Sequence, residues 1–254
     1  MTGVDRGGPR PFELECAGLR LLLWHERALA LPELGLLIAS DAHFGKDQSL
    51  RAAGIPVPPG AVARDLARLD GLLEALRPKR LVWLGDLIHS ETSLSAENEA
   101  QLGAWFRGRP ELEVLLVRGN HDRRAGDPPP DWGLACVDAP AQIGALALYH
   151  YPPLDASQGA APGTDQPRLW LAGHLHPGVD LKGRAGLRLR APCFRLFSAA
   201  GGRPAGLVLP AFGSLTGIHP TPAAEGERRF LCSPEGVFPW PPPAGRLPSR
   251  GRPR

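Results

Sequence analysis

The chain contains a series of short apolar runs that are each followed at once by polar residues. Five of these runs have the length of a buried strand. They span residues 36–39, 81–84, 112–117, 145–149 and 169–172. Continuous apolar runs are typical of strands covered on both faces, as in the parallel sheets of α/β proteins. The pattern therefore predicts an α/β fold.

Two segments between these runs have the pattern of helices. Apolar residues of the segment 61–76 recur at steps of four and three, which makes one helix face. They are Val62, Leu66, Leu69, Leu73 and Leu76. Pro78 is expected to end this helix. A second helix is expected from Ser95 toward Phe106, with acidic residues in its first turn and Pro110 after its end.

Shorter apolar stretches lie near both ends of the chain. Residues 19–24 and 28–31 come before the first run, and residues 186–197 and 205–211 come after the last one. Short or alternating apolar stretches bounded by glycine are typical of antiparallel strands. We therefore expect a second sheet that contains the later strands.

The polar residues that follow the five runs are aspartates, histidines and one asparagine. They form the blocks Asp41-Ala42-His43, Gly85-Asp86, Gly119-Asn120-His121-Asp122, His150 and Gly173-His174-Leu175-His176. The carboxyl ends of parallel strands meet at one edge of a sheet, where open α/β sheets bind ligands. We therefore expect these side chains to converge.

Side chains of these types fit a centre with two metal ions. Two divalent ions about 3.5–4 Å apart hydrolyse phosphate esters by activating water and neutralising the phosphoryl oxygens. A carboxylate bridges such a pair, and Asp86 is the candidate. Oxygen and imidazole donors without thiolate suit Mn²⁺, Fe²⁺ or Zn²⁺. Each block alone also fits an ordinary solvated loop, so the prediction depends on all five together.

Together the blocks resemble the calcineurin-like metallophosphoesterase superfamily, whose pattern is D-x-H, G-D, G-N-H-D, a lone His and G-H-x-H. Longer segments are similar to one branch, the bacterial ligase-associated DNA-damage-response metallophosphoesterases, which are endonucleases or phosphodiesterases. These segments are 40–46, 51–56, 85–90, 173–177, 192–194 and 209–213. The resemblance extends from about residue 19 to about residue 217. It implies a four-layer α/β/β/α sandwich.

The resemblance also implies a role for each residue of the blocks. One ion would be held by Asp41, His43, Asp86 and His176, and the other by Asp86, Asn120, His150 and His174. Manganese is the expected metal, with Fe²⁺ and Zn²⁺ as alternatives. A metal-activated water would attack phosphorus. His121 would protonate the leaving oxygen as general acid, and Asp122 would orient its imidazole.

Three other polar residues are candidates for substrate binding. Lys46 and Arg118 would contact phosphate oxygens, and His89 would line the pocket beside Asp86. A solvated or purely structural role is the alternative for each, and the many arginines of the chain favour it for Arg118.

Two loops rich in glycine and proline border the blocks, at residues 126–133 and 157–167. Long loops beside catalytic residues often act as lids, although surface loops without a function fit equally well. Trp132 is expected either to stack on a base or, more commonly, to fold back on the core.

Composition limits the domain organisation. A chain of 254 residues with 43% hydrophobic residues can bury one sizeable core, so we expect a single domain over residues 1–237. Residues 238–254 are rich in Pro, Gly and Arg and are expected to form a disordered tail. The formal charge falls from +3 to −1 without the four arginines of this tail, so net charge does not favour nucleic-acid binding.

The cysteines and the apolar runs bear on location. The 4 cysteines lack paired short spacings, which predicts neither a disulfide framework nor a zinc knuckle. No apolar run reaches the roughly 18 residues that span a bilayer, and the first residues do not resemble a secretory signal. We therefore expect a cytoplasmic protein without a membrane partner. The sequence does not indicate an oligomeric state.

These observations predict a metal-dependent phosphodiesterase that acts on DNA in repair. The family association adds a DNA ligase and a helicase as partners. One alternative is a hydrolase of small nucleotides or pyrophosphate-linked metabolites. A protein Ser/Thr phosphatase is disfavoured, because that group has an Asp-Arg pair where this chain has His89-Ser90. A metal-bound scaffold in a repair assembly is the non-enzymatic alternative, and the intact His121-Asp122 pair argues against it.

Overall fold

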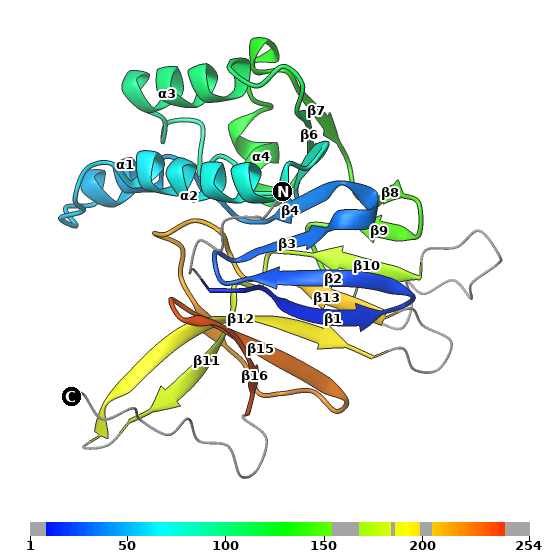
Figure 1. Ribbon diagram of the computed structural model, residues 1–254. Coiled ribbons are helices and arrows are strands. Elements are labelled where there is room, and N and C mark those ends of the chain that lie inside the picture. Colours follow the sequence, from blue (N-terminus) through cyan, green and yellow to red (C-terminus); the bar gives the residue numbers. More distant parts are fainter. Residues whose placement is uncertain (1–8, 154–167, 184–185, 199–204, 242–254) are drawn as a thin grey trace, which may run out of the picture.

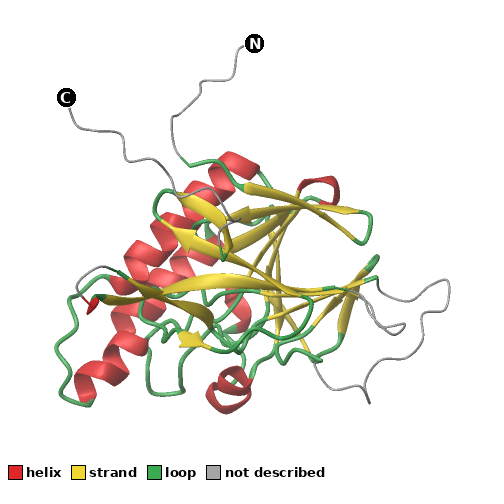
Figure 2. Cartoon of the chain, turned by 90° about the horizontal axis from the view of Figure 1, so that it is seen from below, coloured by secondary structure: helices red, strands yellow, loops and turns green. Residues whose placement is uncertain are grey.

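Two β-sheets packed face to face form the centre of the protein, and the helices lie on the outer side of the first sheet (Figures 1 and 2). The computed structural model describes residues 9–153, 168–183, 186–198 and 205–241. The α/β class and the pair of sheets are confirmed. Within these ranges no helix covers the outer face of the second sheet, so the fourth layer of the expected sandwich is not found there.

The first sheet contains seven strands in sequence order, β1 to β7. Successive strands from β1 to β4 pair antiparallel, and successive strands from β4 to β7 pair parallel. The strands are β1 (Phe12–Cys16), β2 (Leu19–Trp24), β3 (Ala28–Leu31), β4 (Leu36–Ala39), β5 (Arg80–Trp83), β6 (Glu113–Val117) and β7 (Leu134–Val137). The helices are α1 (Lys46–Ala52), α2 (Ala61–Leu76), α3 (Ala96–Arg107) and α4 (Asn120–Ala125), with short 3₁₀ turns η1 (Pro32–Leu34) and η2 (Pro130–Trp132).

The second sheet has the order β14-β11-β12-β13-β10-β9-β8, and β15 and β16 extend from β12. Its three central strands β9, β10 and β13 are parallel, and most of the other pairs are antiparallel. The strands are β8 (Ala141–Ile143), β9 (Leu146–Leu148), β10 (Leu169–Ala172), β11 (Pro177–Lys182), β12 (Arg188–Phe197), β13 (Ala205–Val208), β14 (His219–Pro220), β15 (Glu227–Ser233) and β16 (Gly236–Trp240).

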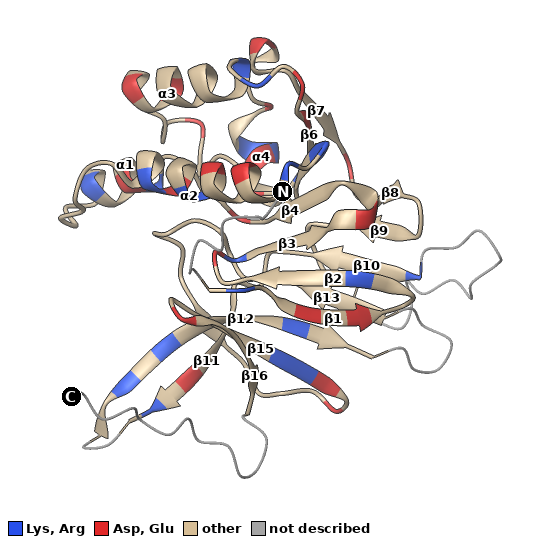
Figure 3. Cartoon of the chain, viewed as in Figure 1, with Lys and Arg blue, Asp and Glu red and all other residues tan. Residues whose placement is uncertain are grey.

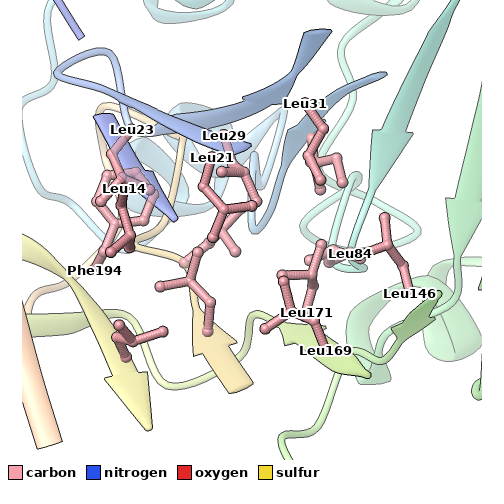
Figure 4. Packing of buried hydrophobic residues seen from close by; sticks show 14 of the residues in the cluster. Leu14, Leu21, Leu23, Leu29, Leu31, Leu84, Leu146, Leu169, Leu171 and Phe194 are labelled. Carbon is pink, nitrogen blue, oxygen red and sulfur yellow. The ribbon is translucent and has the colours of Figure 1, made fainter. Parts of the chain in front are cut away.

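The main core lies between the sheets and consists largely of leucine (Figure 4). Leu29 and Leu84 from the first sheet and Leu146 and Leu171 from the second are fully buried. Burying a leucine side chain stabilises the folded state by about 1.5–3 kcal/mol. A second cluster joins the outer face of the first sheet to α2 and α3. The two clusters hold the ends of the parallel strands in place.

Both expected helices are confirmed. Helix α2 has the predicted bounds, and a left-handed Arg77 ends it one residue before Pro78. Helix α3 begins after Ser95, whose hydroxyl accepts a hydrogen bond from the Asn98 amide at 3.2 Å. This side-chain cap satisfies one of the free amides at the helix start.

The folded region continues past residue 237, where we expected it to end. Strand β16 runs to Trp240 and pairs with β15, with Trp240 opposite Arg229. The prolines of this segment suggested a tail, but β16 pairs with β15 alone, and such an edge strand tolerates proline. The rest of the expected tail and the loop 157–167 lie outside the described residues. In the described part, no helix has the length and apolarity to cross a bilayer.

Candidate metal centre

The predicted metal ligands all follow the carboxyl ends of strands. Asp41 and His43 come after β4, and Asp86 comes after β5. Asn120 begins α4 after β6. His150 follows β9, and His174 and His176 follow β10. Both sheets therefore contribute to the same place, and the seven side chains form two groups around Asp86.

The first group contains Asp41, His43 and His176, whose nearest ligand atoms all lie within 4.8 Å of one another. The Nε2 atom of His176 is 3.2 Å from Oδ1 of Asp41 and 3.4 Å from Nε2 of His43. Oδ2 of Asp86 lies 3.7 Å from Nε2 of His43. These four side chains are the set that the sequence predicted for one ion.

The second group contains Asp86, His150 and His174. Nε2 of His150 lies 3.4 Å from Oδ1 of Asp86, 3.2 Å from Nδ1 of His174 and 3.0 Å from Oδ1 of Asn120. The two carboxylate oxygens of Asp86 therefore point to different groups. This is the arrangement that a bridging carboxylate requires.

The positions of the donor atoms are explained better by bound metal ions than by hydrogen bonds between the side chains. Oδ1 of Asp41 is buried without a hydrogen-bond partner, although burying an unpaired carboxylate oxygen is costly. Ligand atoms about 2.0–2.2 Å from a shared ion lie roughly 3 Å apart, which is the spacing seen between His176 and Asp41. The donors are nitrogen and oxygen only, so the residues present fit divalent ions of the Mn²⁺, Fe²⁺ or Zn²⁺ type.

The backbone is strained at most of these positions. Eight residues other than glycine have a positive φ in the described chain, and five of them are predicted ligands. They are Asp41, His43, Asp86, His174 and His176. Left-handed backbone costs a residue with a Cβ about 1–2 kcal/mol, and such strain concentrates at functional sites. The strand ends thus turn sharply so that adjacent side chains point toward the same centre.

Three glycines of the blocks allow the ligand-bearing loops to approach one another. A Cβ on Gly85 would overlap the imidazole of His150, and one on Gly119 would overlap Oδ1 of Asp86. A Cβ on Gly173 would overlap Ser40 and Asp41. Gly173 is close to Asp41 because the His174 amide donates to Oδ2 of Asp41 at 3.0 Å. No other residue type fits these contacts.

Hydrogen bonds and burial place Asp86 and His43 in the forms that bind metal. His150 Nδ1 donates to the Leu84 carbonyl at 2.8 Å, which leaves Nε2 free to coordinate. Burial disfavours ionisation of Asp86, but the hydrogen bond and charge of His150 outweigh it and lower the pKa of Asp86 to about 2. Burial lowers the pKa of His43 to about 3, against the attraction of Asp41 and Asp86. A neutral imidazole and an ionised carboxylate result.

His121 lies at the open side of the two groups. Its Nε2 is 4.0 Å from Oδ2 of Asp86, and its side chain is 29% exposed whereas that of Asp86 is 3% exposed. His121 Nδ1 donates to the carbonyl of His89 at 2.5 Å. The His89 ring stacks on the His121 ring at 5.0 Å. The bond to the carbonyl directs Nε2 toward the centre, where a substrate would lie.

Asp122 does not orient His121 as we expected. Its carboxylate accepts hydrogen bonds from the amides of Asp86 at 2.6 Å, Leu87 at 2.9 Å and Gly119 at 2.8 Å. Asp122 is the third residue of α4, and its side chain therefore turns back toward the helix start. Its contacts fix the turn that carries Asp86, and the carbonyl of His89 takes the place of Asp122 beside His121.

The three predicted substrate residues have different surroundings. Lys46 begins α1, and burial lowers the pKa of its ammonium group. Burial, and then the charges of Lys46 and His121, lower the pKa of His89 to about 4. His89 adjoins the centre, because its Nδ1 lies 3.2 Å from Nδ1 of His43. Arg118 instead makes a bidentate ion pair with Asp127 at 2.7 and 2.6 Å.

Trp132, inside the predicted lid loop 126–133, and Arg123, just before it, also have structural contacts. Trp132 is buried and stacks on Phe106 with ring centres 5.4 Å apart, so it is not available to a base. Arg123 pairs with Asp138 at 2.9 Å. These contacts give the basic and aromatic residues near α4 a structural explanation.

Tyr151 was not predicted as a site residue. It follows His150 directly, is 52% exposed and has its ring centre 4.3 Å from that of His174. Its position beside a predicted ligand was the only signal in the sequence. The ring presents an aromatic surface at the edge of the second group.

The loop after β13 supports the loop that carries Asp41. The Phe212 and Gly213 amides donate to the carbonyls of Ser40 at 2.7 Å and Asp41 at 3.2 Å. Arg68 of α2 donates to the Phe212 carbonyl and lies over its ring, with the guanidinium carbon 4.2 Å from the ring centre. Asp65 accepts a hydrogen bond from the Ser214 amide at 2.9 Å. Helix α2 thus holds the loop in place.

Comparison with known proteins agrees with this geometry. The calcineurin-like phosphoesterase family model matches residues 34–157. The crystal structure of the Pseudomonas putida nuclease MPE is 34% identical, covers 90% of this chain and 99% of its own, and superposes with a TM-score of 0.72. The phosphoesterase Yfce from E. coli is 17% identical over 77% of this chain and 86% of its own, with a TM-score of 0.37. No curated protein sequence gave a significant match. The chain belongs to the calcineurin-like phosphoesterase family and is a metal-dependent phosphoesterase.

Proposed function

We propose that the protein is a nuclease that hydrolyses phosphodiester bonds in DNA with two divalent ions. The observation that carries this proposal is the Asp86 carboxylate, whose two oxygens face separate groups of donors 3.4 and 3.7 Å away. One ion would be held by Asp41, His43, Asp86 and His176, and the other by Asp86, Asn120, His150 and His174. Manganese is the metal that we propose, with Fe²⁺ and Zn²⁺ as the alternatives to test.

When bound, the ions activate water and neutralise charge on the phosphoryl oxygens. The protein supplies the positioning and the proton. His121 donates the proton from Nε2 to the leaving oxygen, while the His89 carbonyl holds Nδ1–H and fixes the ring. Proton donation by a positioned imidazole accelerates such reactions by roughly 10²–10⁴-fold. The exposed side of His121 is where the leaving group departs.

Two observations indicate a substrate that contains nucleotides, and the first of them favours nucleic acid over small nucleotides. The neighbour with 34% identity is a nuclease, and the exposed ring of Tyr151 offers a surface on which a base stacks. Stacking of one base on an aromatic side chain contributes about 1–3 kcal/mol. The resemblance also predicts a role in DNA repair with a ligase and a helicase. The four free cysteines fit the reducing cytoplasm that we propose as the compartment.

The test is an assay with the metal-free protein reloaded with Mn²⁺, Fe²⁺ or Zn²⁺. Substrates are bis-p-nitrophenyl phosphate, p-nitrophenyl phosphate, cyclic dinucleotides, and labelled DNA and RNA in single- and double-stranded form. We expect metal-dependent cleavage of the diester and of DNA. Hydrolysis of the diester and cyclic dinucleotides without any cleavage of DNA or RNA would establish the small-nucleotide alternative. Metal binding without hydrolysis of any substrate would establish the scaffold alternative.

Tyr151 provides a test of whether a base stacks beside the metal centre. Tyr151→Ala is expected to weaken single-stranded DNA binding by roughly 5- to 100-fold, which corresponds to the loss of one stacked base. Tyr151→Phe is the matched control and keeps the ring, so its affinity stays near that of the wild type. Equal affinities of all three proteins would show that no base stacks on Tyr151.

A further inference from the structure

The outer end of the β11–β12 hairpin carries charge that the metal centre does not use. We call residues 180–183 and 186–190 the outer hairpin. Its register pairs Asp180 with Arg190, Leu181 with Leu189, and Lys182 with Arg188. A hydrogen bond of 2.8 Å from the Gly183 amide to the Leu187 carbonyl joins the strands near the turn. The hairpin extends away from the two-sheet body (Figure 1).

One face of the outer hairpin is basic. Directly paired residues share a face of a sheet, so Lys182, Arg188 and Arg190 lie together with Asp180. Asp180 is the only acid on this face among the described residues. It lies 3.4 Å from Arg190, and both side chains are more than half exposed, at 57% and 63%. An exposed pair of this kind contributes little to stability. Because the face has three basic side chains and one acid, it has an excess of positive charge. Figure 3 shows these basic bands on the outer parts of β11 and β12.

Two other arginines of the second sheet are neutralised by an acid. Arg195, farther along β12, and Arg229 of the neighbouring β15 are buried and both pair with Glu227, at 2.7 and 2.6 Å. Within the described ranges, neither Lys182 nor Arg188 has a carboxylate partner, and both are exposed. The basic side chains of the outer hairpin are therefore free to bind an anion.

The strand that leads to the outer hairpin, β11, begins at the metal centre. Strand β11 starts at Pro177, the residue after His176. The neighbouring β14 is tied to the same point, because the His219 amide donates to the His176 carbonyl at 2.9 Å. Strands rise about 3.3 Å per residue, so positions 180 to 182 lie roughly 13–20 Å from His176. That separation exceeds the length of a single nucleotide but not that of a polynucleotide.

We propose that the basic face of the outer hairpin binds the phosphate backbone of the DNA strand several nucleotides away from the bond that is cleaved. This inference rests on the proposed nuclease function and adds to it a surface that distinguishes polymers from small diesters. Phosphate contacts position a strand without reading its sequence. A second copy of the chain is a poorer occupant, because two equal basic faces would repel each other across a two-fold axis.

The test uses the full-length protein loaded with Mn²⁺ and the variant Arg188→Glu/Arg190→Glu. The control is Arg77→Glu/Lys79→Glu, which makes the same charge change at exposed residues before β5, at the edge of the sheet opposite the metal centre. We measure Kd for labelled single-stranded DNA between 50 and 200 mM salt, DNA cleavage, and hydrolysis of bis-p-nitrophenyl phosphate. Thermal unfolding and light scattering report folding and oligomeric state.

The hairpin variant is expected to bind DNA roughly tenfold or more weakly. The slope of log K against log salt should fall by about 1–1.5, because each phosphate contact contributes about 0.7. Hydrolysis of the small diester should stay within twofold of the wild type, and the control should match the wild type throughout. The DNA affinity of the milder variant Arg188→Gln/Arg190→Gln should lie between those of the wild type and the charge-reversal variant. It serves as the test if the charge reversal causes misfolding.

Unchanged DNA affinity with intact diester hydrolysis would overturn the inference and leave the nuclease proposal standing. An equal loss with both substrates would also overturn it, since the hairpin would then serve the metal centre itself. A wild-type dimer that the variant converts to a monomer would make the face an interface between copies. Absence of any DNA cleavage by the wild type, with diester hydrolysis retained, would instead contradict the proposed nuclease function.

Discussion

The two sheets contribute different chemistry to the same centre. The loops after β4, β5 and β6 of the first sheet provide both carboxylates and the asparagine, together with His43. The loops after β9 and β10 of the second sheet provide only imidazoles, from His150, His174 and His176. Asp41, Asp86 and His150 are almost fully buried, whereas His174 and His176 are half-buried. The first sheet therefore supplies the negative charge that attracts the ions, and the second completes their coordination.

This division predicts that the carboxylates matter most. Asp86→Asn removes the charge that both groups share, and we expect hydrolysis of every substrate to fall by about 10⁴-fold or more, a loss of roughly 5.4 kcal/mol in transition-state stabilisation. Elemental analysis should show fewer than two ions per chain. Asp131→Asn, at an exposed residue in η2, is the control. Full metal content in Asp86→Asn would break the distinction between the sheets.

His121 is not expected to bind metal, so its replacement should separate proton donation from coordination. His121→Ala should slow cleavage of DNA by roughly 10²–10⁴-fold, since a poor leaving group needs a proton. Hydrolysis of bis-p-nitrophenyl phosphate should fall much less, because p-nitrophenolate leaves without one. Metal content should not change, and His25→Ala is the control. Equal losses for both substrates would reject the general-acid assignment.

Metal removal tests whether the centre connects the two sheets. A ligand at 100 times its Kd stabilises the folded state by about 2.7 kcal/mol, and each kcal/mol shifts Tm by roughly 2–4 °C in a protein of this size. We therefore expect Tm to fall by about 5–11 °C when the ions are chelated and to recover with Mn²⁺. Asp86→Asn should show a much smaller shift. The same shift in that variant would mean that the ions stabilise the protein elsewhere.

The smallest effect is expected from the support of Asp41 by helix α2. Arg68→Met removes the hydrogen bond to the Phe212 carbonyl and should weaken binding of Mn²⁺ by about 3- to 10-fold, or roughly 1 kcal/mol. Arg64→Met, on the exposed side of the same helix, is the control. Titration calorimetry measures both affinities. Unchanged Mn²⁺ affinity in Arg68→Met would show that the loop after β13 does not position Asp41.

The sequence predicted the strand ends that carry the site and the helices α2 and α3, because local patterns determine them, but it did not predict α1 and α4. Helix α2 has its predicted bounds, since its apolar face packs on the first sheet. The predicted role of Asp122 was wrong because the side chains of Asp122 and His121 contact different groups, although the two residues are consecutive. The Gly119-x-x-Asp122 spacing of a helix start was the signal that would have revealed it. The support of Asp41 by Arg68 joins distant segments, which no local pattern in a single sequence indicates.

The left-handed backbone at the five proposed ligands restricts how the centre can be redesigned. A β-branched side chain at Asp41 or His43 would add steric conflict with the main chain to the loss of a donor. Asparagine, aspartate and histidine tolerate this conformation better than other residues with a side chain. A library that aims to change the metal preference should therefore sample these three amino acids first at the five positions. Neighbouring positions without a left-handed backbone, such as Tyr151, can be varied more widely.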